Sequence, residues 1–520
     1  MYEGLILTSE KFKHYIQKFN EKDEELYAHI PNSKAWDFLQ RNIPLFEIDE
    51  PLIEITWYFR WWTYRKHVKK TPDGYVITEF LPPVPWAGKY NTISCPAAHH
   101  IYEGRWLLDQ KYMDDYENFW LKKGGEPRKY SFWIADAFYN RYLVNKNEQI
   151  LIDLLPGLID NYKAWEKGKR YRKFKTLKAG LHINGLFFQI DDRDGGEMSI
   201  GGHGYRPTIN SYMYGDARAI SKIAELAGKD EIKRIYEEKA TEIKRLVQKK
   251  LWDSQNGFFK TLKKRPSKLV DVKELIGYYP WYFNMPDNQF NIAWDELMDP
   301  EGFFAPYGPT TAEQRHPRFQ ISYEGHQCQW NGPSWPHATS ILLTAMANLL
   351  NNYTPENIST ADYMKMLLIY TKCHTLTREN GDVVPWIGEN INPYTGDWIA
   401  RTRLKNWEKG IWPAHKGGKE RGKDYNHSTY NDLIITGLIG LRPRPDNILE
   451  INPLIPHTQS ETPFDYFCLD RLLYHGHLLT ICWDKMGDQY HKGKGFQLFC
   501  DGNMIASCPY LVKLTASLES

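Results

Sequence analysis

The sequence predicts a mainly α-helical protein that ends in a small β-rich region. Several long segments before residue 442 have apolar residues at the 3.6-residue helical period. After Arg442-Pro443-Arg444-Pro445, short apolar or alternating runs separated by Gly and Asp replace that period. The composition, 42% hydrophobic and 25% charged, is that of a globular protein and excludes a disordered chain, a coiled coil and a collagen-like repeat.

The clearest predicted helix is Thr208–Gly228, where apolar residues lie near one face and Gly228 provides a C-cap. Asp230–Leu251 follows at once, so we expect a helical hairpin with a very short joint. The other predicted helices are Ser131–Lys146, Gln149–Glu166, Trp335–Asn352, Ala361–Thr377 and Ser428–Leu441. Between helices lie long loops rich in Gly, Pro, Trp and Asp, namely Pro82–Tyr102, Asp191–Pro207, Asp299–Pro336 and Asp382–Tyr425. Their aromatic content favours a functional role over disorder.

Three regions are expected along the chain. Residues 1–45 are charged and mixed and should form a helical arm packed on the main body, which occupies residues 46–445. Residues 446–520 should form the β-rich module, with strands at Leu449–Ile451, Leu478–Trp483 and Phe496–Cys500.

Charge and hydropathy exclude several classes of partner. The chain has 66 basic and 64 acidic residues, so no overall field would recruit nucleic acid or an anionic membrane. We interpret the basic segment Lys163–Lys178 as a solvated face, and no apolar stretch reaches the roughly 18 residues of a membrane helix. The N-terminus shows no signal peptide, which predicts a cytoplasmic protein if Met1 is native and a periplasmic or secreted one if a leader was removed.

Metal and cofactor motifs are absent from the sequence. The seven cysteines form no CxxC or zinc-ligand spacing, and no P-loop, dinucleotide fingerprint, GxSxG or HExxH occurs. His99-His100 and the pair His475 and His477 have no third ligand at helical spacing, so we expect structural or hydrogen-bonding roles for them. The sequence therefore predicts no cofactor and no metal.

Aromatic residues make up 15% of the chain, including 19 Trp, and this excess suggests a ligand. Trp330 and Trp335 flank Asn331-Gly332-Pro333-Ser334 just before a predicted helix. They are suited to stacking on sugar rings, although both could equally be core residues at a helix entry.

Two carboxylate segments could supply acid–base chemistry. Asp191-Asp192-Arg193-Asp194-Gly195-Gly196-Glu197 places four carboxylates in seven residues, and such crowding should raise at least one pKa, as a general acid requires. A solvated turn and a Ca²⁺ loop are alternative readings, although the spacing does not match an EF-hand. Glu389, flanked by Trp386 and turn residues, could be a base facing a sugar cleft or an ordinary loop carboxylate.

The order of the motifs resembles the (α/α)6-barrel six-hairpin glycosidases of the trehalase and glycoside hydrolase family 63 clan, including bacterial mannosylglycerate-hydrolase-like enzymes. The resemblance covers roughly residues 55–445 and rests on six motifs in the same order. They are Glu103-Gly-Arg105-Trp106-Leu-Leu-Asp109, the acid loop DDRDGGEMSIGG, Arg206-Pro-Thr-Ile-Asn210-Ser-Tyr212, Gln329-Trp330-Asn331-Gly332-Pro333-Ser334-Trp335, Glu389-Asn-Ile-Asn-Pro-Tyr-Thr-Gly396 and Asn426-His427-Ser428-Thr-Tyr-Asn431-Asp432.

The resemblance implies an (α/α)6 barrel with a small C-terminal β-rich module, and an inverting glycosidase that uses two carboxylates. Matching loop to loop, Asp194 takes the general-acid position and Glu389 the general-base position. Trehalases have a Glu-Ser-Gly-aromatic lead-in before the acid, whereas Arg193 precedes Asp194 here, which leaves Asp192 or Glu197 as substitutes.

The expected substrate-binding residues lie in the same loops. They are Trp86, Glu103, Arg105, Asp192, Glu197, Arg206, Asn210, Gln327, Trp330, Asn331, Trp335, Trp386 and His427. The predicted function is exo-acting, inverting hydrolysis of an oligosaccharide. A lyase using Tyr212, Tyr425, His427 and Arg206, and a catalytically inactive carbohydrate-binding barrel, are the alternatives. The sequence specifies neither the sugar, its linkage nor the oligomeric state.

Overall fold

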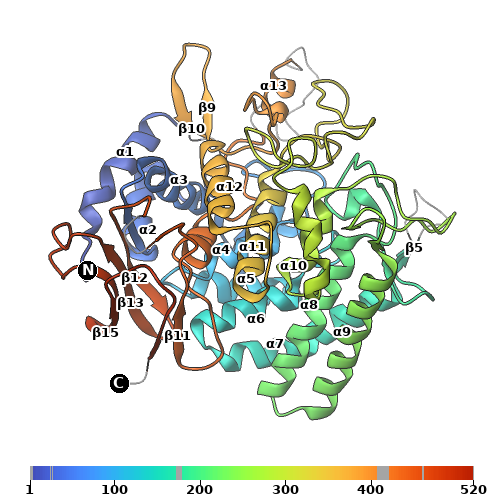
Figure 1. The fold of residues 1–520 in the computed structure, drawn as a ribbon, viewed down its shortest axis with the longest axis horizontal. Helices are drawn as coiled ribbons and strands as arrows, with labels where there is room; N and C mark the ends of the chain where they lie inside the picture. Colours follow the sequence, from blue (N-terminus) through green and yellow to red (C-terminus); the bar gives the residue numbers. More distant parts are fainter. Residues whose placement is uncertain are drawn as a thin grey trace.

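The computed structural model describes residues 4–23, 25, 27–170, 178–406, 421–458 and 462–518. Within these residues the chain is mainly helical, with small antiparallel sheets (Figure 1). The α-helices are α1 Lys13–Glu21, α2 Ala35–Asn42, α3 Pro51–His67, α4 Ala97–Gly104, α5 Lys111–Lys122, α6 Ile134–Asn145, α7 Glu148–Lys167, α8 Pro207–Leu226, α9 Asp230–Lys250, α10 Tyr279–Tyr282, α11 Pro336–Asn352, α12 Thr360–Lys372, α13 Ile399–Asn406 and α14 Asn431–Leu433. Short 3₁₀ and π turns are η1 Ser9–Phe12, η2 Asn32–Lys34, η3 Lys89–Asn91, η4 Asp191–Arg193, η5 Leu275–Tyr278, η6 Asn288–Glu296 and the π turn η8 Ile434–Leu438.

Short strands occur along much of the described chain, and the longest ones, β12 to β15, lie near its C-terminal end. They are β1 Leu45–Ile48, β2 Val68–Thr71, β3 Gly74–Ile77, β4 Lys169–Arg170, β5 Lys178–Leu181, β6 Phe187–Phe188, β7 Trp252–Asp253, β8 Phe258–Phe259, β9 Thr375–Thr377, β10 Val383–Pro385, β11 Ile448–Ile451, β12 Tyr466–Tyr474, β13 His477–Asp484, β14 Gly495–Cys500, β15 Asn503–Cys508 and β16 Leu514–Ser517. The largest sheet has the order β1-β12-β13-β14-β15, so a strand from the N-terminal region completes it, with Phe46 opposite Leu469. The sequence analysis did not anticipate β1.

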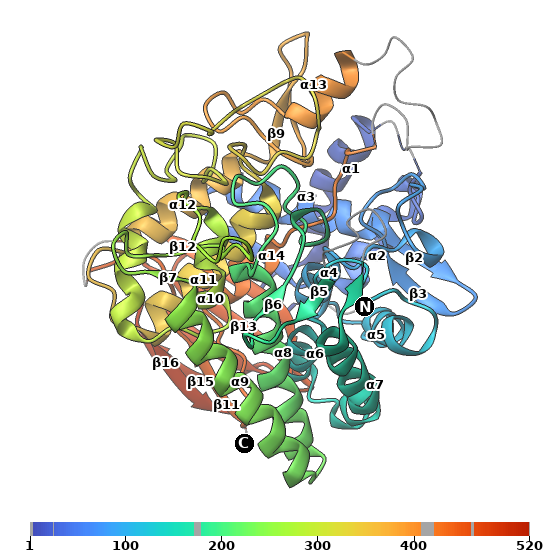
Figure 2. The same ribbon diagram turned by 90° about the vertical axis from the view of Figure 1, so that its right-hand side faces the viewer.

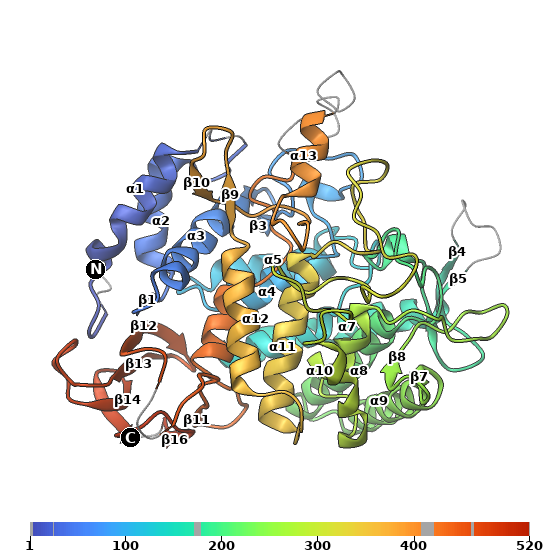
Figure 3. The ribbon, with the colours of Figure 1, turned by 45° about the horizontal axis from the view of Figure 1, so that its top comes forward.

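The helices pack in a closed ring. Contacts run from α3 to α12, then through α11, α10, α8, α6, α4 and α14 back to α3. Helix α9 packs against α8 outside the ring, and α1 and α2 pack on α3. Figure 3 shows α1, α2 and α3 next to the C-terminal strands. In Figures 1 and 2 the β9–β10 hairpin and α13 project at one end of the ring, and the turn between α8 and α9 lies at the opposite end.

Segments with a one-sided apolar period were predicted well. The expected hairpin is α8 and α9, and the expected strands correspond to β11, β13 and β14. Two predicted helices were too long. Helix α12 stops at Lys372 because Thr375–Thr377 forms strand β9, and Ser428–Leu441 contains only one α-helical turn followed by the π turn.

Helices α3, α4, α5, α10 and α13 were not predicted individually, and α13 lies within the expected loop Asp382–Tyr425. Burial explains why α3 and α4 were missed. Helix α3 is buried from Thr56 to His67, including Arg60, Arg65 and Lys66, so it has no polar face that would reveal a period. Helix α4 is buried at every position and lies inside the segment expected to be the loop Pro82–Tyr102. Helix α5 was also missed, although it has a buried and an exposed side. No helix in the described part of the chain has the length and apolarity needed to cross a membrane.

Candidate active site

Loops at the end of the ring that carries β9–β10 surround a cavity of about 360 Å³. Its described lining combines carboxylates, aromatic rings, two arginines, two thiols and three imidazoles. These residues are Glu79, Phe80, Trp86, Ile93, Cys95, Tyr130, Asp192, Arg193, Gly195, Glu197, His326, Gln327, Cys328, Trp330, Trp335, His337, Glu389, Arg421, Tyr425 and His427. Such a mixture of apolar walls and a few polar groups is typical of a small-molecule site.

Glu389 is buried at the cavity wall and is held by the loop that precedes α11. The Cys328 thiol donates to Glu389 Oε1 over 3.4 Å, and the neighbouring Asn390 side chain donates to the Gln327 carbonyl over 2.9 Å. An Arg421 guanidinium nitrogen lies 3.6 Å from Glu389 Oε2. Because thiol and guanidinium both face the carboxylate, its position is fixed before any ligand arrives.

Glu197 lies on the opposite loop, which a buried ion pair holds in shape. Arg206 Nε lies 2.6 Å from Asp194 Oδ2, and Arg206 Nη1 donates to the Ser199 hydroxyl and the Gly202 carbonyl over 3.1 and 2.6 Å. These partners bracket Glu197 on both sides in sequence. The Trp330 amide donates to the Glu197 carbonyl over 3.1 Å and thus joins this loop to the segment that carries Cys328.

Electrostatics distinguish the carboxyl groups that line the cavity. Burial raises the pKa of Glu197 well above its ordinary value, and the charges of Asp192 and Glu389 raise it further. Burial also raises the pKa of Glu79 to about 8, again with a contribution from Glu389, while a hydrogen bond from the Tyr425 hydroxyl opposes the shift. Two carboxyl groups that favour the protonated form therefore face the same cavity as Glu389.

The floor of the cavity is made of imidazole and indole rings. Burial lowers the pKa of His337 to about 4 and that of His427 well below its ordinary value, so both rings are neutral. His427 Nε2 lies 3.2 Å from the Glu389 carbonyl oxygen. Trp330 and Trp335 stack on each other with centroids 4.8 Å apart and planes 19° apart, so each indole has one face covered by the other.

Asp194, which was expected to be the general acid, does not line this cavity. It is buried, and its Oδ2 accepts from Arg206 and from the Thr208 hydroxyl. Burial raises its pKa, and Arg206 together with hydrogen bonds from Ser131 and Thr208 opposes that shift. Its neighbours Asp192 and Glu197 reach the cavity instead.

Six other expected substrate-binding residues also lie outside the described lining: Glu103, Arg105, Arg206, Asn210, Asn331 and Trp386. Glu103 and Asn210 are two examples whose side chains form hydrogen bonds with the backbone and thereby stabilise the fold. Glu103 accepts the backbone amides that begin α14, with the Asn431 and Asp432 amides each at 2.9 Å. Asn210 bonds the Phe187 amide and carbonyl, both at 2.9 Å.

The remaining expected residues reach the cavity. They are Trp86, Asp192, Glu197, Gln327, Trp330, Trp335, Glu389 and His427. Widely separated loops thus converge on one cavity, as the motif order indicated.

Comparison with known proteins identifies the fold family. Residues 89–428, well over half of the chain, match the model of the mannosylglycerate hydrolase MGH1-like glycoside hydrolase domain. The chain belongs to this family. A solved structure titled sialidase is 41% identical with a TM-score of 0.88, and it aligns with all of this chain but only 45% of the sialidase chain.

More distant relatives extend the comparison. A family 78 rhamnosidase of Bacillus sp. GL1 is 10% identical with a TM-score of 0.54, over 85% of this chain and 40% of the rhamnosidase, which shows similarity of fold alone. An uncharacterized protein of Borreliella burgdorferi B31 is 23% identical over 152 residues, which are 29% of this chain and 30% of that protein. The chain therefore spans less than half the length of the sialidase and of this curated relative.

Several lining residues of this MGH1-like domain were not predicted. Glu79 stands alone between Thr78 and Phe80 without any motif, and Arg421, His337 and Cys328 carry no signal of their own. For His337 and Cys328, the only indication in the sequence was that both lie next to the Trp330–Trp335 motif, which was expected at the cavity. Of the basic segment Lys163–Lys178, residues 171–177 lie outside the described residues.

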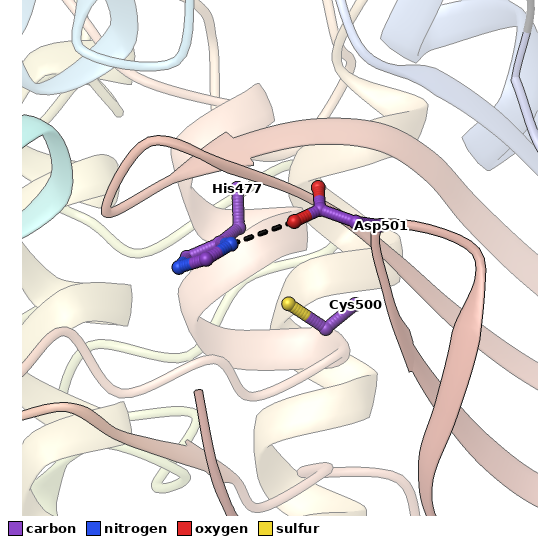
Figure 4. A group of neighbouring side chains, drawn as sticks. All are labelled: His477, Cys500 and Asp501. Atoms are coloured by element: carbon purple, nitrogen blue, oxygen red, sulfur yellow. Dashed lines mark hydrogen bonds and ion pairs between the residues drawn. The ribbon is translucent and has the colours of Figure 1, made fainter. Parts of the chain in front are cut away.

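One group of side chains that could hold a metal ion lies elsewhere in the MGH1-like chain. His477, Cys500 and Asp501 bring their ligand atoms within 4.8 Å of one another, and Figure 4 shows the three side chains converging. His477 Nδ1 lies 2.7 Å from Asp501 Oδ2, and burial raises the pKa of the Cys500 thiol, which disfavours the thiolate that a metal would need. None of the three lines the cavity, and no other group of three in the described chain satisfies the same geometry.

The other histidines of this MGH1-like chain that were expected to have structural or hydrogen-bonding roles differ in their contacts. The His99 ring packs edge-on against the rings of Trp133 and His337, with centroids 5.3 and 4.6 Å away, whereas His100 and His475 make hydrogen bonds. His100 has Tyr116 Oη at 2.9 Å and the Asn426 carbonyl at 2.7 Å, and His475 Nε2 lies 3.0 Å from the Leu143 carbonyl.

Proposed function

We propose that this chain is an inverting, exo-acting glycoside hydrolase that removes a neutral sugar from an oligosaccharide, with Glu197 as general acid and Glu389 as general base. The observation that carries the proposal is that both side chains line one cavity and that the charge of Glu389 helps to raise the pKa of Glu197. Paired carboxyl groups with opposed protonation states are what glycoside hydrolysis needs.

The proposed reaction uses Glu197 as a protonated carboxyl and Glu389 as a carboxylate. The protonated Glu197 carboxyl donates its proton to the glycosidic oxygen as the bond from that oxygen to the anomeric carbon breaks. The Glu389 carboxylate takes a proton from a water molecule whose oxygen forms the new bond to the anomeric carbon from the opposite face. The product has the inverted configuration. Glu389 then releases its proton to solvent and Glu197 takes one up, which restores the starting state.

Other lining residues would prepare the substrate. The Glu79 carboxyl, protonated near neutral pH and bonded to Tyr425, can exchange hydrogen bonds with sugar hydroxyls without adding a charge beside Glu389. Trp86 lies near Arg421, whose guanidinium carbon is 5.1 Å from the ring centroid, and supplies an apolar wall for a sugar face.

The charge pattern of the cavity supports a neutral substrate. Arg193 lies 3.3 Å from Asp192, and Arg421 lies 3.6 Å from Glu389, so each described arginine of the lining faces a carboxylate. An acidic sugar such as a sialoside would have to compete with these carboxylates for its arginine. Similarity to the sialidase therefore does not decide the substrate, especially since this chain spans 45% of that protein.

The cavity volume supports exo action, and the helix ring supports the barrel. About 360 Å³ is near the lower end of the roughly 300–1,000 Å³ found for ligand pockets, which suits a chain end better than a long polymer. The closed ring of helix contacts supports an (α/α)6 barrel at residues 46–445, with the arm 1–45 and the β-rich module 446–520 beside it.

The lyase alternative has less support. Tyr425 would have to act as a base, yet burial and the nearby Glu79 and Glu389 charges raise its pKa well above the ordinary value. Tyr212 does not line the cavity, and Arg206 is paired with Asp194.

The test is an oligosaccharide panel that includes a sialylated trisaccharide and neutral gluco-, manno- and rhamno-configured substrates, with NMR of the first-formed anomer. Release of a neutral terminal sugar with inverted configuration, lost in Glu389→Gln, supports the proposal. Retained configuration, release of sialic acid alone, or a product with the absorbance of an unsaturated sugar would contradict it.

A further inference from the structure

A second cavity lies at the other end of the helix ring, and its volume is about 280 Å³. The same chain segments reach both cavities. Trp335 and His337 at the start of α11 line the first, whereas Thr344 and Asn348 further along that helix line the second. From His337 to Asn348 the helix rises by about 16 Å, at roughly 1.5 Å per residue, so the two cavities are separate sites.

Other segments repeat this arrangement. Cys95 precedes α4 and lines the first cavity, and Tyr102 within α4 lines the second. His427 precedes α14 and faces the first cavity, while Thr436 and Arg442 beyond that helix face the second. The second cavity therefore belongs to the body of the fold and not to a surface loop.

Basic side chains outnumber acidic ones in the second cavity. Four basic residues line it, namely Arg105, Arg218, Lys222 and Arg442, against the two carboxylates of Asp136 and Asp432. One pair cancels, because an Arg105 guanidinium nitrogen lies 2.7 Å from Asp432 Oδ1. Lys222 is also paired, 3.0 Å from Glu225 outside the lining, so Arg218 and Arg442 remain against the single carboxylate of Asp136.

Arg442 shows most clearly that a negative partner would fit. Its guanidinium donates to Asn348 Oδ1 over 2.8 Å and to the Thr436 carbonyl over 3.4 Å, which are both neutral acceptors. In the described chain no carboxylate lies within 4 Å of it, and burial lowers its pKa. Arg442 is partly exposed and faces the cavity with neutral acceptors only, so an anion in the cavity could form charge-assisted hydrogen bonds with its guanidinium.

The residues around Arg442 complete a small binding site. Arg218, on the neighbouring helix α8, is exposed and likewise has no carboxylate within 4 Å among the described residues. The Tyr102 and Tyr282 rings stand 5.8 Å apart at 62° and form an apolar wall. Asp136 accepts a hydrogen bond from the Tyr102 hydroxyl over 2.7 Å, and burial raises its pKa to about 6, so its negative charge is lost as the pH falls toward that value.

We propose that this cavity binds a small oxyanion, either inorganic phosphate or the phosphate group of a monosaccharide-sized ligand, between the guanidinium groups of Arg442 and Arg218. Guanidinium groups suit this role because they hold phosphate oxygens through paired, charge-assisted hydrogen bonds. The site is independent of the proposed hydrolysis, since none of its described lining residues lines the first cavity.

Isothermal titration calorimetry of the full chain tests the site with inorganic phosphate, glucose 6-phosphate and neutral glucose at low ionic strength. We expect at least one phosphate compound to bind with a Kd of about 1 mM or tighter, and binding of inorganic phosphate to be unchanged by added glucose, which the first cavity could hold. Binding of inorganic phosphate alone would mean that the oxyanion suffices. Tighter binding of glucose 6-phosphate would mean that the tyrosine wall contributes.

Variants locate the site. Arg442→Gln and Arg218→Gln should each weaken phosphate binding at least tenfold, and Arg218→Gln tests the site even if Arg442→Gln does not fold, because Arg218 is exposed. Arg245→Gln, an exposed α9 residue paired with Glu242 at 2.6 Å, and Glu197→Gln in the first cavity should bind as the wild type does. The proposal would be overturned if no phosphate compound bound at concentrations up to about tenfold above the expected Kd, or if Arg218→Gln bound phosphate as tightly as the wild type.

Discussion

The assignment of the acid to Glu197 and not to Asp194 can be tested by exchanging each carboxyl for its amide. Glu197→Gln keeps the size of the side chain but cannot donate the proton, so kcat should fall about 10²- to 10⁴-fold, the usual contribution of a general acid. At about 1.36 kcal/mol per factor of ten, this corresponds to about 2.7–5.5 kcal/mol of transition-state stabilisation. The loss should largely disappear for an aryl glycoside with an acidic leaving group, because that group departs without protonation.

Stability distinguishes the two positions independently. Glu197→Gln removes a carboxyl that burial and the Asp192 and Glu389 charges already disfavour in its ionised form, so the melting temperature should not fall. Asp194→Asn removes the carboxylate 2.6 Å from buried Arg206, and such a change costs about 3–5 kcal/mol. With roughly 2.1 cal/mol/K of unfolding entropy per residue over 520 residues, the melting temperature should fall by about 3–5 °C if the chain unfolds cooperatively.

The assay is kcat on the natural substrate and on the activated glycoside, together with a thermal melt of each variant. Thr208→Val is a matched control, because it removes one hydrogen bond to Asp194 and leaves the ion pair with Arg206 in place. A Glu197→Gln enzyme with full activity on the natural substrate would refute the assignment. So would an Asp194→Asn enzyme that melts normally and has lost activity selectively on the unactivated substrate.

The remaining predictions concern the same cavity. Glu389→Gln should lower kcat at least 10³-fold on natural and activated substrates alike, since both need an activated water molecule. A loss confined to the natural substrate would contradict the role of Glu389 as the general base. The kcat/KM of the wild type should fall as pH rises through the raised pKa of Glu197, because only the protonated acid works, and this alkaline limb should be absent from the residual activity of Glu197→Gln. The pKa of Glu79 is about 8 in the folded state and ordinarily near 4.5, so the folded state holds this proton more tightly than the unfolded state does. Denaturant titrations should show that the free energy of unfolding falls as the pH rises from about 4.5 to 8, with a smaller fall in Glu79→Gln. Cys328 should react slowly with a thiol reagent at neutral pH, because burial and the charges of Glu389 and Glu197 raise the pKa of its thiol; rapid inactivation that Cys328→Ser abolishes would contradict this.

The sequence predicted those parts of the fold whose apolar residues repeat on one side. Helix α9 and the second half of α8 have exposed positions between buried ones at helical spacing, so their period is visible. Strands β13 and β14 are mostly buried, and they were recognised as short apolar runs bounded by Gly and Asp. Helix α3 is surrounded by other elements and buries even Arg60, Arg65 and Lys66, and burial of this kind leaves no polar face from which a period can be recognised. Strand β1 was missed for another reason, since its partner β12 lies more than 400 residues away in the chain.

The same distinction explains how much of the site could be predicted. The acid loop and the Glu389 loop were expected to meet, and Glu197 and Glu389 do line one cavity. Which carboxylate of the acid loop would face that cavity could not be derived, because the answer depends on Arg206, which turns back to bind Asp194 and the loop carbonyl of Gly202. A carboxylate paired with a buried guanidinium is occupied in holding the backbone, and a carboxyl crowded by like charges retains its proton. Local crowding in the sequence therefore predicted a raised pKa in this loop, whereas the pairing of Asp194 with Arg206, which only the fold reveals, is the reason why we propose Glu197 and not Asp194 as the acid.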